Sequence, residues 1–134
     1  MAITLDAFTL PDGLRWIDEF AWSPTAQQTG YLVAGTLLVE ESVKQAGRPI
    51  TLVGGQAWAW MQRSEVEALH AALTAADASF TLTLHDGRQF NVVPDHSGEG
   101  PLSTRPLPIV RDSGPANPAS SSWYVIERIR FLEV

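Results

Sequence analysis

The thirteen-residue segment from Tyr31 to Val43 most limits how this chain can fold. Its apolar residues fall on both sides of an extended backbone, with Tyr31, Val33, Leu37 and Val39 on one side and Leu32, Ala34 and Leu38 on the other. The mean strand has only about five or six residues. We therefore expect one long strand that is either buried on both faces or projects beyond its own sheet.

Turn-forming residues flank this expected strand. Polar residues 27–30 predict a turn before it, and residues 44–47 predict a turn after it. Residues 48–53 should then return as its antiparallel partner. Because Pro49 donates no ladder hydrogen bond, it should lie at the start of that returning strand or on a sheet edge.

Shorter strand-like segments occupy much of the remaining chain. Further strands are predicted over residues 3–10, 14–22, 57–60, 107–110 and 123–134, with a hairpin over 80–92. The acidic pairs Asp18-Glu19 and Glu40-Glu41 lie within predicted strands. Neighbouring strand residues point to opposite faces, so neither pair should act jointly on one substrate atom.

The positions of the apolar residues predict the pairing register of the hairpin over residues 80–92. A two-residue Asp86-Gly87 loop would leave Phe90 opposite Thr83 and divide the apolar side chains between two faces. A three-residue loop places all five on one face, namely Phe80, Leu82, Leu84, Phe90 and Val92. We therefore predict a type I turn with a G1 bulge and a left-handed Gly87.

One helix is predicted over about residues 64–76. Ser64 and Glu67 have the spacing of a capping box, in which each side chain accepts a hydrogen bond from the other residue's backbone N–H. An apolar stripe then recurs at helical spacing through Val66, Leu69, Leu73 and Ala76. This helix should cover one face or one end of the sheet.

Residues 94–122 differ in composition from the rest of the chain. They hold six of the nine prolines, several glycines and a run of three serines. Because a structureless stretch of this length is uncommon inside a domain, we expect the edge strand at 107–110 within it. Residues 111–122 should form a mobile loop, either a solvated connection or an ordered contact to a partner.

These elements predict a single domain over residues 1–134. The expected fold is mainly β, an antiparallel β-sandwich or barrel with one flanking α-helix at about residues 64–76 and a Pro/Gly/Ser-rich loop region at 94–122. The apolar strand at 123–134 should hold the C-terminus in the sheet.

The composition excludes several classes of protein. The chain contains no cysteine, which excludes a disulfide scaffold and any cysteine-built zinc or iron–sulfur site. Its formal net charge of −6 argues against a general nucleic-acid binder. Only 18% of its residues are charged and 45% are hydrophobic, which indicates that part of the surface meets other protein.

No targeting or membrane segment is predicted. The first residues lack the basic region and apolar core of a signal peptide. The longest apolar stretch, at 31–39, is far shorter than the ~20 residues that a membrane-spanning helix needs. We expect synthesis in a cytoplasm and no membrane contact.

The chain has few residues in patterns typical of catalysis. His85 adjoins Asp86, and Asp95 adjoins His96, so each pair has the residue types of a zinc site or of a base with its orienting carboxylate. Neither pair has a third ligand within sequence reach, which favours solvated turn residues. We therefore predict no catalytic, cofactor-binding or metal-binding residue and no enzyme, with a metal-dependent hydrolase built on these four residues as an alternative.

The five tryptophans predict contact surfaces. Trp58 and Trp60 lie two residues apart, on one strand face, and would suit a corner of the core. Tryptophan is also enriched at protein interfaces. A carbohydrate-binding module is the competing interpretation, and it requires at least two exposed, coplanar tryptophan rings.

Four segments carry a resemblance to a known class of proteins. They are residues 10–24 (LPDGLRWIDEFAWSP), 47–52 (GRPITL), 82–88 (LTLHDGR) and the Trp123-Tyr124 start of the last strand. Together with the helix, and in this order, they resemble small tail proteins of long-tailed bacteriophages and prophages over nearly the whole chain. The resemblance implies a distal tail protein, which forms the baseplate ring, or a minor tail protein in that position, with a tail-tube-like fold.

The resemblance also implies partners and a location. It implies a ring, with a hexamer favoured, that contacts the tail-tube, tape-measure and baseplate hub proteins in the virion after assembly in the bacterial cytoplasm. DNA would pass through the ring without specific binding, and a net charge of −6 per subunit suits such a channel. The candidate interface residues are Trp22, Tyr31 and Arg48, chosen for their size and loop-adjacent positions. A tail-tube protein or a tail-completion protein is the alternative within this class.

Overall fold

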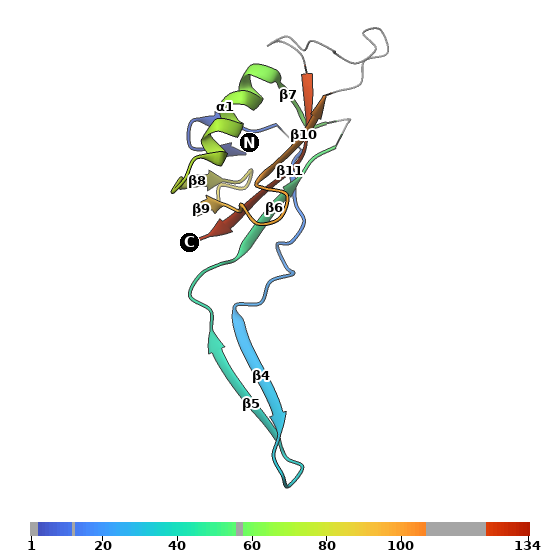
Figure 1. Ribbon diagram of the computed structural model, residues 1–134, viewed down its shortest axis with the longest axis vertical. Helices are drawn as coiled ribbons and strands as arrows, with labels where there is room; N and C mark the ends of the chain where they lie inside the picture. The colour runs from blue at the N-terminus through green and yellow to red at the C-terminus, as the bar shows by residue number, and fades with distance from the viewer. Residues whose placement is uncertain (1–2, 12, 56–57, 107–122) are drawn as a thin grey trace.

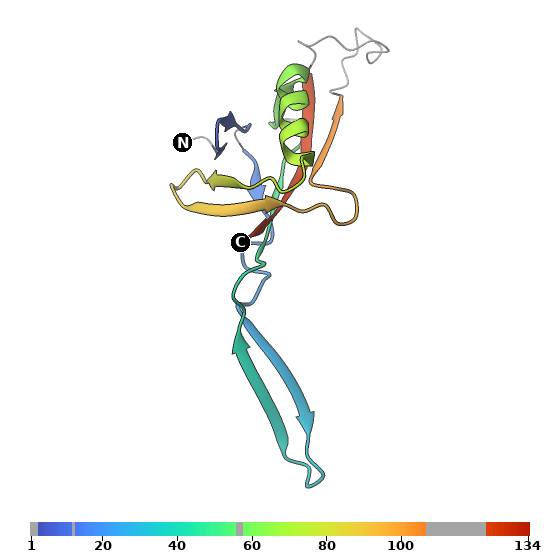
Figure 2. The same ribbon diagram turned by 60° about the vertical axis from the view of Figure 1, so that its left-hand side comes forward.

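The computed structural model describes residues 3–11, 13–55, 58–106 and 123–134. They form a β-rich body and a long two-stranded arm that leaves it at one end (Figures 1 and 2). The elements in chain order are β1 (Thr4–Leu5), β2 (Phe8–Thr9), β3 (Arg15–Trp16), β4 (Thr25–Tyr31), β5 (Leu37–Val43), β6 (Pro49–Val53), β7 (Trp60–Gln62), α1 (Arg63–Thr74), β8 (Phe80–Thr83), β9 (Gln89–Pro94), β10 (Leu102–Pro106) and β11 (Trp123–Glu133).

The body is a nine-stranded antiparallel sheet organised around β11. Its main path runs β2-β1-β8-β9-β11-β6-β3, and β7 and β10 also pair with β11. With eleven residues, β11 is long enough to pair with four strands. The backbone N–H of Val134 donates to the carbonyl oxygen of Asn91 at 2.9 Å, so the C-terminus is held in the sheet as predicted.

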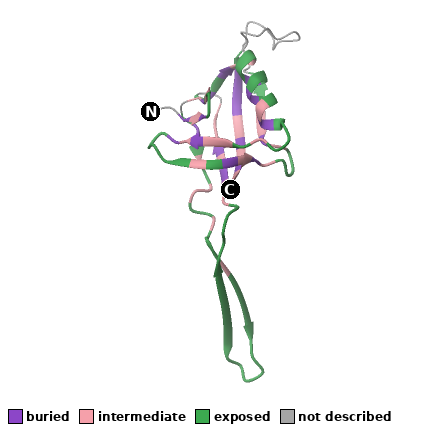
Figure 3. Cartoon of the chain, turned by 90° about the vertical axis from the view of Figure 1, so that its left-hand side faces the viewer, coloured by how far each residue is buried: buried purple, intermediate pink, exposed green. Residues whose placement is uncertain are grey.

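The helix α1 packs against β7 and β11 and contributes to the core. Its buried residues, Val66, Leu69 and Leu73, belong to the predicted apolar stripe. Burial of this face and the antiparallel sheet confirm the predicted fold class, a mainly β protein with one helix in the described residues. Figure 3 shows buried residues concentrated in the body.

The predicted capping box at the start of α1 is wrong. Pairing with Trp123 in the sheet keeps the backbone of Gln62 extended, so the N-cap position falls at Gln62. The side chain of Gln62 makes no capping hydrogen bond. Ser64 therefore falls inside the first turn. Glu67 instead forms an ion pair with Arg63 at 2.9 Å. Ala76 lies beyond the end of the helix and is exposed.

The β8–β9 hairpin confirms the predicted three-residue loop. Leu82 pairs with Phe90, and the backbone N–H of Leu84 donates to the carbonyl oxygen of Arg88 at 2.9 Å. Gly87 has φ +90°, and its N–H donates back to Leu84 at 3.0 Å. The apolar side chains of both strands thus share one face, as their alternation requires.

The predicted single strand over residues 31–43 is wrong, because this segment turns back on itself. The backbone N–H of Leu32 donates to the carbonyl oxygen of Thr36 at 2.8 Å, and Gly35 takes φ +86° between them. Residues 27–30, predicted as a turn, lie instead in β4. Their polarity reflects a strand that faces solvent.

Two neighbouring predictions also need correction. Residues 48–53 form β6 as a strand, with Pro49 at its start, but β6 pairs with β3 and β11 and not with residues 31–43. The expected strand over 14–22 stops after Trp16. There the carboxylate of Asp18 accepts hydrogen bonds from the backbone N–H of Thr51 at 3.0 Å and from its hydroxyl at 2.9 Å, which holds the chain in a turn. The pair Asp18-Glu19 is thus not in a strand.

The strands near residues 57–60 and within 94–122 also differ from those predicted. The strand expected at 57–60 begins only at Trp60 and runs to Gln62. Within the expected loop region, residues 102–106 form β10, since they find a pairing partner in β11. The predictions for 107–110 and 111–122 lie outside the described residues.

Gly54 marks the point where β6 ends against β11. A Cβ atom at this position would overlap the carbonyl oxygen of Ile126 and the Cβ of Ala59. Backbone hydrogen bonds fix both neighbours, since Gly54 donates to Glu127 at 3.0 Å and Ile126 donates to Ala59 at 2.8 Å. Only glycine fits this approach without a shift of the backbone.

Candidate functional site

The arm, residues 24–44, is the most unusual surface of the molecule. Its base is closed by the backbone N–H of Lys44, which donates to the carbonyl oxygen of Pro24 at 2.7 Å. From there β4 and β5 run outward as a separate two-stranded sheet (Figure 1). Six of the seven residues of β4 and all seven of β5 are exposed (Figure 3).

The pairing register gives the arm two different faces. Directly paired residues share a face of a two-stranded sheet. One face, called the apolar face here, carries the pairs Thr25–Val43, Gln27–Glu41, Thr29–Val39 and Tyr31–Leu37. The other, called the polar face, carries Ala26–Ser42, Gln28–Glu40 and Gly30–Leu38. Large apolar side chains therefore collect mainly on one side.

The apolar face continues into the tip of the arm, residues 32–36. Tyr31 is 79% exposed, Leu37 is 50% exposed and Val39 is 44% exposed, and Val33 at the tip is fully exposed. No residue from 29 to 39 carries a charged side chain. Contiguous exposed apolar surface of this kind marks a contact site for protein or membrane. An isolated two-stranded hairpin is also only marginally stable in water, so such an arm gains order when a partner covers it.

The body holds the base of the arm through Trp16. The guanidinium carbon of Arg48 lies 4.7 Å from the centre of the Trp16 ring, and that of Arg88 lies 5.6 Å away. Arg88 also forms an ion pair with Glu19 at 2.7 Å. The hydrogen bond to Glu19 raises the pKa of Arg88. Arg48, which follows the arm, is thus joined to Trp16, which precedes it.

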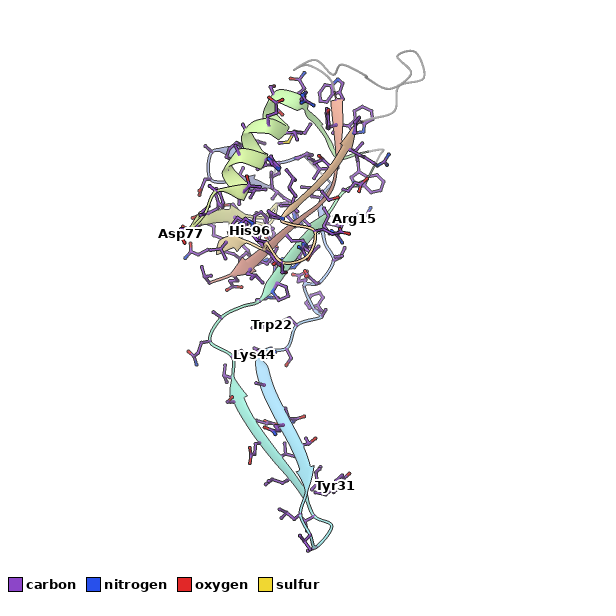
Figure 4. The ribbon with its side chains drawn as sticks, in the orientation of Figure 1. Arg15, Trp22, Tyr31, Lys44, Asp77 and His96 are labelled. Atoms are coloured by element: carbon purple, nitrogen blue, oxygen red, sulfur yellow. The ribbon has the colours of Figure 1, made fainter. Side chains whose placement is uncertain are left out.

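The three candidate interface residues are not brought together. Tyr31 lies at the far end of the arm on its apolar face, whereas Trp22 lies at the base, with the Lys44 ammonium 5.2 Å from its ring centre (Figure 4). Arg48 is occupied within the chain, because it stacks on Trp16 and donates to the carbonyl oxygen of Glu19 at 2.8 Å. Of the three, Tyr31 is the one with a largely free surface.

The expected core position of Trp58 and Trp60 is wrong, since each is 47% exposed. Trp60 contacts the ring of Trp123 at a centroid distance of 6.4 Å, and the two planes are inclined by 53°. They therefore do not make the coplanar platform that a carbohydrate-binding module requires. Arg15 stacks on Trp58 at 5.4 Å.

The two His-Asp pairs lie in separate turns, and in each turn the aspartate makes the contacts that hold it. Asp86 forms an ion pair with Arg88 at 2.7 Å, and a hydrogen bond from the backbone N–H of Arg88 lowers the pKa of the Asp86 carboxyl. Asp95 accepts hydrogen bonds from the Ser97 hydroxyl at 2.6 Å and from the Ser97 backbone at 3.0 Å. The hydroxyl contributes most to lowering the pKa of Asp95. Across the described ranges, no three His, Asp or Glu side chains gather in a group that could hold a metal ion.

The sequence analysis allowed a strand that projects beyond its sheet but did not predict the hairpin of the arm, although two signals for a hairpin are present. Gly35 interrupts the apolar segment, and the polar run Gln27-Gln28 mirrors the acidic run Glu40-Glu41 across it. The structure pairs these runs directly, and the side-chain amide of Gln27 donates to Glu41 at 2.6 Å.

Comparison of the chain with protein-family models, with curated proteins and with solved structures gave no match. Within the described residues, α1 is too short and too polar to cross a membrane.

Proposed function

We propose that this chain is the distal tail protein of a long-tailed bacteriophage, a structural subunit of the baseplate ring that connects the tail tube to the tip. The observation that carries the proposal is the arm with its unpartnered apolar face. A subunit of an assembly needs surface that is stable only when a neighbour covers it, and the arm offers such surface away from the body.

The distribution of the apolar residues supports assembly over a role in ligand binding. Val39 and Leu37 point to the same side of the arm as Tyr31, so they form an extended strip and not a concave pocket. Small-molecule sites are typically concave, whereas flat, extended apolar strips pack against other proteins. Burying one Leu or Val side chain fully contributes about 1.5–3 kcal/mol, so covering this strip favours the association of subunits.

The sequence resemblance makes the proposal more specific. Segments 10–24, 47–52 and 82–88 resemble phage tail proteins of this position, and the ring they imply would have six subunits. Its partners would be further copies of the chain, the tail-tube protein, the tape-measure protein and the hub. The net charge of −6 suits a ring around DNA, because acidic subunits do not retain the phosphate backbone.

The direct test is the oligomeric state together with the location. Purified protein is measured by light scattering after size exclusion over a range of concentrations, and rings are sought by negative-stain microscopy. We expect a closed oligomer, and labelling of the end of the tail tube by antibodies against the chain in phage particles. A protein that stays monomeric at high concentration and is missing from the particles would refute the proposal. Labelling along the whole tube would assign the chain to the tube instead.

A further inference from the structure

A row of residues crosses four strands of the body on the face that points away from the core. Arg15 of β3 pairs with Val53 of β6. Val53 in turn pairs with Arg128 of β11, which also pairs with Ser103 of β10. Directly paired residues share a face of a sheet. Because Leu52, the neighbour of Val53, is fully buried in the core, these four residues, called the outer row here, lie on the opposite face.

The outer row borders a concavity of about 410 Å³. Its lining includes Gly54, Gly55 and Arg105 beside the row residues Val53 and Arg128. Glycines leave part of the surface without side chains, so an incoming segment can approach the sheet backbone there. Both arginines are partly exposed, with 43% of the Arg105 side chain and 41% of the Arg128 side chain accessible.

An exposed tryptophan lies next to this concavity. A Cβ atom at Gly55 would lie 2.6 Å from the Trp58 ring, so the ring packs directly against the glycine backbone. The guanidinium of Arg15 stacks on the same ring at 5.4 Å. Tryptophan and arginine are the residue types enriched at the positions that dominate binding in protein interfaces.

The two arginines of the outer row can accept a new carboxylate partner. Within the described ranges, no ion pair involves Arg15, and stacking on Trp58 leaves the edge of its guanidinium able to donate. Arg128 pairs with Glu99 at 2.5 Å, but the Glu99 side chain is 78% exposed. Exposed ion pairs contribute little to stability, so another carboxylate can replace Glu99.

We propose that the outer row and its concavity bind an acidic segment of a different protein, with one carboxylate on Arg15 and a second on Arg128. Charge complementarity carries the proposal, because this arginine-rich face belongs to a chain with a net charge of −6. Strands lie about 4.8 Å apart, so the backbones of the two arginines are about 10 Å apart. Alternate residues of an extended segment are about 7 Å apart on one side, and the long arginine and glutamate side chains span the difference.

The carboxylates of this chain do not suit the outer row, which is why the occupant is assigned to another protein. Asp18 and Asp95 are already hydrogen-bonded within the chain, and Glu19 pairs with Arg88. The acidic pair Glu40-Glu41 on the arm is exposed. However, its two side chains point to opposite faces, so they cannot contact two arginines on one side.

Binding of a blocked hexaglutamate peptide to the full chain tests the proposal. The peptide carries an uncharged fluorescent label, its anisotropy is followed at low ionic strength, and hexaglutamine is the uncharged comparison. We expect saturable binding of hexaglutamate alone. Arg15→Gln and Arg128→Gln should each weaken it about tenfold. The matched control, Lys44→Gln, removes the same charge at the base of the arm and should stay within about twofold of wild type.

A second measurement uses the wild-type chain and does not depend on how well a variant folds. Hexaglutamate should shift the indole N–H signal of Trp58 in a nuclear magnetic resonance spectrum, with the signal assigned from Trp58→Phe. An unshifted signal, an absence of saturable binding, or equal weakening by Lys44→Gln would overturn the inference.

Two further results would assign the face to another occupant and so also overturn the inference. One is tighter binding of a DNA duplex that is lost in Arg15→Gln and Arg128→Gln. The other is loss of self-association in Arg15→Gln, which would point to a second copy of this chain. The inference does not depend on the proposed function, which is tested separately by the oligomeric state and the location in phage particles.

Discussion

A lysine placed on the apolar face of the arm should weaken assembly far more than a lysine placed one residue further on the polar face. Leu37 and Leu38 are adjacent residues of one type and are 50% and 43% exposed, yet the register puts them on opposite faces. They therefore form a matched pair of variants, Leu37→Lys and Leu38→Lys, in which side-chain size and intrinsic strand preference are the same.

The expected size of the effect follows from the exposed fraction. A neighbour that covers Leu37 would bury the exposed half of its side chain, which contributes about 1 kcal/mol. That amount alone corresponds to roughly a fivefold loss in the association constant. A lysine at the same position must also lose hydration if it is buried, which costs several kcal/mol more. We expect Leu37→Lys to shift the oligomer toward monomer by well over fivefold, and Leu38→Lys to leave it within about twofold of wild type.

Sedimentation equilibrium over a concentration series measures the association constants of both variants and of wild type. Thermal unfolding of each variant serves as the control for folding. Because both side chains project from the arm into solvent, the unfolding transition of the body should not move. Equal weakening by the two variants would refute the assignment of an apolar and a polar face. If the association constant of Leu37→Lys equals that of wild type, the apolar face is not the contact surface.

Three further predictions concern the stability of the body. Gly54→Ala should lower the free energy of unfolding by about 3 kcal/mol through overpacking. In the control variant Gly30→Ala a Cβ meets nothing within 4 Å, so the free energy of unfolding should stay within about 1 kcal/mol of wild type. Equal melting temperatures of the two variants would contradict this. Asp18→Ala removes two hydrogen bonds to Thr51 and should cost about 2–3 kcal/mol in urea unfolding, and an unchanged midpoint would contradict the turn described here. The lowered pKa of Asp95 means that its ionised form stabilises the fold above the ordinary pKa of 3.8 and that this contribution is lost as the pH falls through the lowered value. The Asp95→Asn variant should therefore lose less stability between pH 5 and pH 2 than wild type, and parallel pH profiles would refute this role.

Local patterns were sufficient for the elements whose partners are close in sequence. The apolar stripe of α1 and the β8–β9 hairpin are such cases, because Leu82 and Phe90 are close along the chain and only one loop length puts them on one face. The terminal strand was also recognisable, since eleven mostly apolar residues can remain extended only inside a sheet.

The arm illustrates what local patterns leave undecided. An apolar segment with both faces hydrophobic is equally compatible with a buried strand and with a strand that a neighbouring molecule covers. The choice depends on which strands pair. Here β6 pairs with β11 in the body and therefore does not pair with β5. With β6 in the body, β5 pairs with β4 instead, and Gly35 lies in the turn between them.

By itself the sequence determined an antiparallel, mainly β fold with one helix, a local hairpin with its loop length, and a chain without cysteine. The tertiary structure decided the rest. It separated the arm from the body, assigned Tyr31 and Leu37 to one face of the arm, and turned Asp18 toward Thr51, thirty-three residues away. The physical reason is that helix stripes and hairpin registers depend on neighbours along the chain. Strand partners and exposed faces depend instead on contacts between segments distant in sequence, where several pairings satisfy the same alternation of apolar residues.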